Sequence, residues 1–254
     1  MEITNKAEAA FLALAFLFMV GSMAGWVIEL FFRRFISSKN PERKWINPGF
    51  LVGPCLPLYG FGLASMFVMS ILPYIGLDYS KGLTPLQVVL TVLAMGVMMT
   101  LIEYIAGLIF IKGMKIKLWD YSDEPLNLQG IICIRFSIIW TVLAGVYYFF
   151  IQPYAIMLVK WFGANIGFTF IVGMFYGIFL IDLCYSFNVC SKIRKFAVDN
   201  QVVVRYEALK QEIRRDTDRV KKSWRFLLAL HPDRSLYDTM KEQIEKIIDS
   251  NMAH

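Results

Sequence analysis

The chain has 254 residues, of which 57% are hydrophobic and 18% charged, and its mean hydropathy is +0.53. This composition excludes an ordinary soluble domain and indicates a chain that is embedded in a lipid bilayer. The net charge of +6 does not indicate nucleic-acid binding. The basic residues flank apolar segments, where the preference of Lys and Arg for cytoplasmic loops accounts for them.

Five apolar stretches follow one another along the chain, each long enough for the roughly 20 helical residues that cross a bilayer. They cover approximately residues 9–32, 50–76, 85–111, 131–152 and 162–187. Residues 191–254 differ, because they are rich in charges of both signs. We therefore predict an all-α, polytopic membrane protein: a transmembrane domain of five helices over residues 1–190 and a cytoplasmic, amphipathic helical tail over residues 191–254.

The tail carries apolar residues at helical spacing from Tyr206 to Leu228, and His231-Pro232 then interrupts the pattern. Three interpretations stay open: a helix lying on the inner leaflet, a hairpin packed on itself, or a docking helix for a partner protein.

The distribution of Lys and Arg predicts the orientation in the membrane. Basic residues gather after the first, third and fifth spans: Arg33, Arg34, Lys39, Arg43, Lys44, Lys112, Lys115, Lys117, Lys192, Arg194 and Lys195. The opposite side has only Lys6, Lys81 and Lys160. We therefore expect a multi-pass protein of the plasma membrane with its N-terminus outside and its C-terminus in the cytoplasm.

Four ionisable residues fall inside the predicted spans, all toward the cytoplasmic side: Glu29, Glu103, Arg135 and Asp182. A charge at the centre of a membrane helix costs about 2.5–3.5 kcal/mol on insertion scales, so such residues are candidates for function. Glu29 and Arg135 are shallow enough to reach the headgroups. For the deeper Glu103 and Asp182 we expect an ion pair with Arg135, which would serve either as a structural contact or as part of a ligand site.

The stretch from Asn47 to Gly60 opens the second span and contains Pro54 and Pro57. Prolines leave backbone groups unpaired, which the membrane tolerates only where protein, water or ligand satisfies them. The pattern is consistent with an unwound, ligand-facing turn or with a kinked helix, and we expect the kinked helix.

A second polar motif, Trp119-Asp120-Tyr121-Ser122 followed by Asn127, lies between the third and fourth spans. Its aromatic residues are typical interface anchors. Asp120 and Asn127 require another role, such as helix capping or a polar pocket.

The two pairs of spans resemble each other. Glu29 is followed by a basic loop and Asn47-Pro-Gly, and Glu103 is followed by a basic loop and Asn127-Leu-Gln-Gly. Equal topology would make this a parallel repeat of the kind that transporters use. Chance similarity between apolar helices is the alternative.

The ordered series Gly25-Trp26…Glu29, Asn47…Gly49-Phe50-Leu51…Gly53-Pro54…Pro57…Tyr59-Gly60, Glu103, Trp119-Asp120-Tyr121-Ser122 and Asn127…Gly130-Ile131 resembles the ABC-transporter type IV membrane-protein family of bacteria, over roughly residues 10–150. The resemblance implies a multispanning, permease-like protein. The sequence contains no Walker A pattern, so an ATPase would be a separate subunit.

These observations define one candidate substrate-binding set: Glu29, Asn47, Glu103, Asp120, Asn127, Arg135 and Asp182. The leading hypothesis is a transporter or permease component with a cytoplasm-facing polar pocket. The alternatives are a non-transporting interaction or sensor subunit and an inner-leaflet enzyme that acts on lipids or small amphiphiles, with Glu103 or Asp120 as acid or base.

No metal, cofactor or catalytic triad is predicted, because both histidines lie in the tail and the four cysteines lack metal-ligand spacing. The expected partners are the lipid bilayer and, through the tail, a separate ATPase or another cytoplasmic protein.

Overall fold

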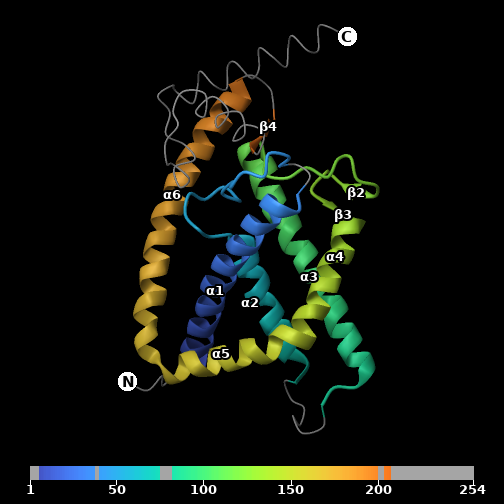
Figure 1. Cartoon of the computed structure of the whole chain (residues 1–254), viewed down its shortest axis with the longest axis vertical. Helices are drawn as coiled ribbons and strands as arrows, with labels where there is room; N and C mark the ends of the chain where they lie inside the picture. Colours follow the sequence, from blue (N-terminus) through green and yellow to red (C-terminus); the bar gives the residue numbers. More distant parts are fainter. Residues whose placement is uncertain (1–5, 38–39, 75–81, 200–202, 207–254) are drawn as a thin grey trace.

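The computed structural model describes residues 6–37, 40–74, 82–199 and 203–206 (Figure 1). Six α-helices dominate it: α1 (Lys6–Phe35), α2 (Pro57–Ile71), α3 (Pro85–Leu108), α4 (Ile134–Val146), α5 (Gln152–Ala164) and α6 (Thr169–Asp199). Short 3-10 helices η1 (Leu72–Tyr74) and η5 (Ile166–Phe168) and π-helices η3 (Ile109–Gly113) and η4 (Tyr147–Ile151) extend or connect them. Two small ladders complete the described fold: β1 (Ile116–Lys117) pairs in parallel with β4 (Val204–Arg205), and β2 (Asn127–Leu128) pairs antiparallel with β3 (Ile132–Cys133).

Within the described residues, five helical segments are long and apolar enough to cross a membrane: Lys6–Phe35, Pro57–Tyr74, Pro85–Gly113, Ile134–Ala164 and Ile166–Lys195. The predicted all-α membrane fold with five spans is thus confirmed. α6 continues past residue 190 as one helix to Asp199. Beyond Tyr206, the predicted amphipathic tail lies outside the described residues.

The first four spans form two antiparallel hairpins, α1 with α2 and α3 with α4 (Figure 1). Small residues allow the helices of each hairpin to approach closely, which is the usual packing mode in membranes. A β-carbon placed on Gly25 of α1 would overlap the Tyr59 ring of α2. One placed on Gly96 of α3 would overlap Thr141 of α4. Leu17, Met95 and other buried side chains fill the core between the hairpins.

Helix starts follow local sequence signals. Thr84 caps α3: its backbone N–H donates to Gln87 Oε1 at 2.8 Å, and its hydroxyl accepts from the Gln87 N–H at 3.4 Å. This reciprocal arrangement is a capping box, and Pro85 follows at a position where its missing N–H costs nothing. Pro57 likewise occupies the start of α2.

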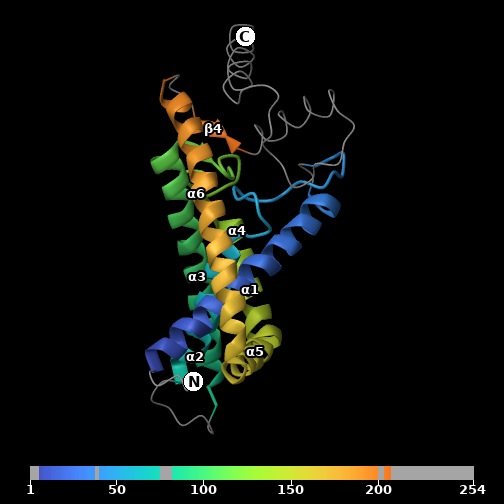
Figure 2. The same cartoon turned by 90° about the vertical axis from the view of Figure 1, so that its left-hand side faces the viewer.

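The chain changes direction after α4. The π-helical turn η4 follows α4, Pro153 lies at the start of α5, and α5 runs across one end of the bundle (Figure 1). π-turns and prolines are recognised causes of such bends. α6 returns along the bundle and contacts α1, where the Tyr176 hydroxyl donates to the Ala15 carbonyl at 3.1 Å (Figures 1 and 2).

The basic segments share one end of the molecule. α1, α3 and α6 run in the same direction, so the residues that follow α1 and α3 and the last part of α6 lie together at the end opposite α5 (Figure 1). The N-terminal end of α1 lies at the α5 end. The three segments rich in Lys and Arg are therefore placed on one side of the bundle, as the proposed orientation requires.

Candidate functional site

The segment that precedes α2 is irregular. Phe50–Leu56 has no helical structure, and α2 begins only at Pro57. The expected kinked helix over this stretch is therefore wrong. The physical reason lies in Pro54 and Pro57, because each removes a backbone donor and disfavours helical geometry at the residue before it.

Two polar side chains form hydrogen bonds with the backbone of this segment: one donates to its carbonyls and the other accepts from its N–H groups. The Asn47 amide donates to the carbonyls of Leu51 at 3.1 Å and Val52 at 2.8 Å. The Asp182 carboxylate of α6 accepts from the N–H groups of Val52 at 3.0 Å and Gly53 at 2.8 Å. Irregular backbone at membrane depth is tolerated only where such partners exist. We refer to Asp182 with Val52 and Gly53 as the Asp182 clasp.

Asn47 also anchors the segment to α1. The Trp26 indole N–H donates to the Asn47 side-chain oxygen at 2.6 Å, so the buried amide uses both its donor and its acceptor. One turn further along α1, Glu29 accepts hydrogen bonds from Arg33 at 2.9 Å and from the Tyr59 hydroxyl of α2 at 3.1 Å. Glu29 is therefore charge-paired within its own helix and linked to its hairpin partner.

Glu103 of α3 is 3% exposed, so nearly all its surface is inside the protein. One carboxylate oxygen accepts from the Tyr121 hydroxyl at 3.0 Å, and the other accepts from the Trp140 indole of α4 at 2.9 Å. The predicted pairing of Glu103 or Asp182 with Arg135 is wrong. Arg135 projects outward, 66% exposed, and pairs with Glu124 of the loop at 3.1 Å.

Aromatic rings join the two glutamates. Tyr59, which donates to Glu29, meets the edge of Trp140, which donates to Glu103; their ring centroids are 6.3 Å apart at an angle of 68°. We call the set Glu29, Tyr59, Trp140, Glu103 and Tyr121 the Glu29–Glu103 network. It crosses from the α1–α2 hairpin to the α3–α4 hairpin in the half of the bundle that faces the basic loops.

The loop after η3 positions Tyr121 for this network. Asp120 accepts from the hydroxyl and backbone N–H of Ser122 and from Lys117. Burial alone would raise the pKa of Asp120, but these hydrogen bonds and the Lys117 charge outweigh burial and lower the pKa. Burial, together with the Glu103 carboxylate, raises the pKa of Tyr121, so its hydroxyl remains a proton donor.

Asn127 organises the same loop. Its amide donates to the carbonyls of Ser122 and Glu124, and its oxygen accepts from the Gly130 N–H at 3.0 Å. Gly130 has a φ of +66°, a conformation that favours glycine. Asp120 and Asn127 thus shape the loop and do not touch the carboxylates between the helices.

The seven candidate residues separate into four places. Glu29 and Glu103 belong to one network, Asn47 and Asp182 hold one irregular segment, Asp120 and Asn127 form the loop, and Arg135 lies outside. Sequence reasoning missed Tyr59 and Trp140 as partners. Trp140 carried a usable signal, because an indole N–H deep in an apolar span requires an acceptor. Among the described residues, no group of three or more His, Cys, Asp and Glu side chains is arranged to hold a metal.

The two hairpins share several contacts. In each, a glutamate of the first helix accepts from a tyrosine hydroxyl, and an asparagine after the basic loop donates to two loop carbonyls. The parallel repeat stays a prediction that these contacts support.

A bundle of five apolar spans, with Glu103 buried and Glu29 and Asp182 half-buried between its helices, defines a polytopic membrane protein. The model of the family described as "Putative ABC-transporter type IV" matches residues 16–187, more than half of the chain, and the chain belongs to that family. The match extends from α1 into α6 and includes Asp182, beyond the stretch that carried the resemblance in sequence. Comparison with curated proteins and with solved structures gave no match.

Proposed function

We propose that the chain is the membrane-embedded component of an ATP-driven transport system of the plasma membrane, with its N-terminus outside and its C-terminus in the cytoplasm. Family membership supports the transport role. The concentration of Lys and Arg at one end of the bundle supports the orientation. Because the sequence has no Walker A pattern, a separate subunit supplies ATP hydrolysis.

The observation that carries the proposal is the environment of Glu103. It is buried, and Tyr121 and Trp140, the two residues that donate hydrogen bonds to its carboxylate, are neutral. Within the described residues, no Lys or Arg forms an ion pair with it. Neutral donors stabilise a buried carboxylate less completely than an opposite charge does. The network therefore favours a cargo with a positively charged group, which would neutralise Glu103 during passage.

The Asp182 clasp supports a path beside this network. Transporters place substrates where helices are interrupted at membrane depth, because unwound backbone and helix ends supply polar groups there. Phe50–Leu56 is such an interruption, directly before α2, and Tyr59 on the first turns of α2 reaches the network. Movement of this segment would shift Tyr59, which donates to Glu29 and contacts Trp140, the donor to Glu103. It would therefore change the hydrogen bonding of both glutamates.

Purification from native membranes tests the proposal. The full chain, isolated in mild detergent, is expected to co-purify with an ATPase. Mass spectrometry should identify this partner by a peptide that contains a Walker A motif, and the preparation should hydrolyse ATP. A Glu124→Gln variant is the matched control, because it changes a half-buried glutamate of the loop that pairs with Arg135 and lies outside the Glu29–Glu103 network. A preparation in which no ATPase accompanies the chain in any mild detergent contradicts the proposal and favours a non-transporting subunit.

A further inference from the structure

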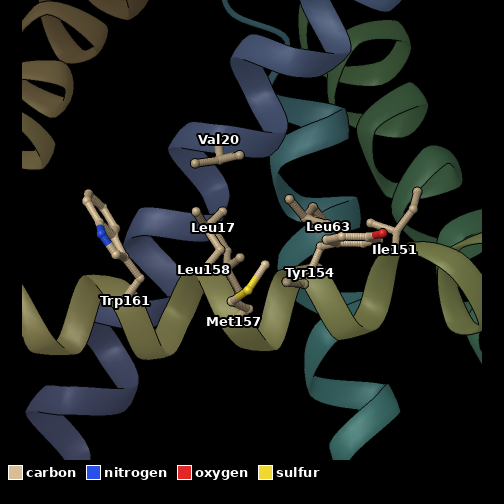
Figure 3. A pocket seen from close by; sticks show the side chains of 9 residues that line it. Leu17, Val20, Leu63, Ile151, Tyr154, Met157, Leu158 and Trp161 are labelled. Atoms are coloured by element: carbon tan, nitrogen blue, oxygen red, sulfur yellow. The ribbon is translucent and has the colours of Figure 1, made fainter.

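A cavity of about 540 Å³ lies at the other end of the bundle from the Glu29–Glu103 network, where α5 crosses α1 and α2 (Figure 3). α5 forms one wall with Tyr154, Met157, Leu158 and Trp161. The opposite wall is formed by Leu17 and Val20 of α1 and Leu63 of α2. This volume is within the usual range of small-ligand sites.

The cavity has an apolar floor and an open rim. Leu17 is 0% exposed and Ala155 is 4% exposed, so the floor belongs to the packed core. Met157 is 60% exposed and Tyr154 is 66% exposed, so the rim reaches the surface of the bundle. None of the nine described residues that line the cavity carries a charge. Cavities of this kind hold apolar molecules in preference to water.

The surroundings of the cavity favour one kind of occupant. Lipid surrounds the apolar spans of a membrane protein, and a hydrocarbon chain is the apolar molecule available to this cavity in excess. The rim residues Tyr154 and Trp161 are of the types that collect at the boundary between headgroups and acyl chains. Lys160, exposed on α5 beside Trp161, offers a positive charge near this boundary.

We propose that the cavity between α1, α2 and α5 binds one acyl chain of a bilayer phospholipid, which enters laterally past Met157. Such a lipid would fill the gap under α5 and hold this transverse helix against α1 and α2. The site is distinct from the carboxylate network and does not depend on the transport role, because its lining contributes no residue to either the network or the Asp182 clasp.

Photocrosslinking tests this site. The full chain is reconstituted in nanodiscs that contain phosphatidylglycerol with a diazirine near the end of one acyl chain, and labelled peptides are mapped by mass spectrometry. Labelling is expected to concentrate on α5 and on the stretch of α1 around Leu17 and Val20. Labelling spread evenly over the lipid-exposed faces of α3 and α4 would overturn the proposal.

Variants that fill the cavity provide a second test of the proposed lipid site. Val20→Phe places a ring in the cavity, and Val97→Phe places the same ring on the exposed face of α3 as a matched control. We expect Val20→Phe to lose the α5 label and Val97→Phe to retain it. Met157→Trp, which alters only the exposed rim, should also reduce labelling and covers the case in which Val20→Phe fails to fold. Unchanged labelling in Met157→Trp, and in Val20→Phe where it folds, would overturn the assignment.

Discussion

The Asp182 carboxylate accepts a hydrogen bond from the Gly53 N–H at 2.8 Å, although the two residues are 129 positions apart in the sequence. The contact joins α6, the last span, to the unwound backbone before α2. It is supported by a second bond, from Val52, and by the Ser186 hydroxyl one turn further along α6 at 3.1 Å. The fold therefore places an intramembrane acid on backbone donors that would otherwise be unsatisfied.

Asp182→Asn tests the clasp. An asparagine keeps one acceptor oxygen but replaces the other with a donor, so one of the two N–H groups loses its partner. A fully buried donor left unpaired costs about 1–3 kcal/mol, and these half-buried N–H groups should cost less than that. We expect a lower midpoint of thermal unfolding in detergent for Asp182→Asn and no change for Asp123→Asn, whose side chain is exposed in the loop. Equal midpoints for the two variants would show that the clasp contributes nothing to stability.

Tyr121→Phe isolates one bond of the Glu29–Glu103 network. The substitution removes the hydroxyl that donates to Glu103 and leaves the ring, which stacks on Phe136 with centroids 4.4 Å apart. Hydrogen bonds to charged groups contribute about 1.5–3 kcal/mol, so the free energy of unfolding should fall by an amount of that order. Tyr185→Phe, at an exposed tyrosine of α6, should leave it unchanged. A loss of the same size in both variants would rule out a specific role for the Tyr121 hydroxyl.

Gly25→Ala tests the close contact of α1 with α2. The added methyl group overlaps the Tyr59 ring, and overpacking of this kind costs about 1–3 kcal/mol. Gly173→Ala in α6 is the matched control, since a β-carbon there meets nothing within 4 Å. Thermal unfolding should separate the two, with Gly25→Ala destabilised and Gly173→Ala unchanged or slightly stabilised. A neutral Gly25→Ala would mean that α1 and α2 are less closely packed.

The loop at Asp120 should lose stability in acid. Because the folded-state pKa of Asp120 is below its ordinary value of 3.8, the carboxylate stabilises the loop above that value. This contribution disappears as the pH falls through the folded-state pKa. Limited proteolysis of residues 117–133 across acid pH should show the loss in the native chain. In the Asp120→Asn variant the loop should be cleaved more readily near neutral pH, and its cleavage should change less as the pH falls. The Asp123→Asn variant should behave like the native chain.

The sequence alone was sufficient to predict the five membrane helices. It was not sufficient to predict which groups bond the acidic residues within them. Hydropathy and length predict five spans because a bilayer imposes one requirement on every spanning helix. The intramembrane acids were also recognisable, since a charge is costly there. Which group meets each acid depends on helix rotation and on the path of Phe50–Leu56, and neither leaves a periodic signal in the sequence.

Arg135 is the clearest example of a contact that could not be predicted from the sequence. As the one basic residue among the predicted spans, it was the natural partner for Glu103. The structure begins α4 at Ile134, so Arg135 lies in the first helical turn, close enough to the loop to pair with Glu124. Tyr121 and Trp140 take its expected place, because the Tyr121 hydroxyl and the Trp140 indole N–H each donate to one oxygen of Glu103.

The proposed movement of a positively charged cargo past Glu103 can be measured as ATP-dependent transport into proteoliposomes that contain the chain and its ATPase. Fluorescent or radiolabelled organic cations, beginning with ethidium, and matched organic anions are the probes. We expect ATP-dependent movement of a cation that Glu103→Gln abolishes and Glu124→Gln leaves intact. Transport of anions alone, or cation transport unchanged by Glu103→Gln, would contradict it.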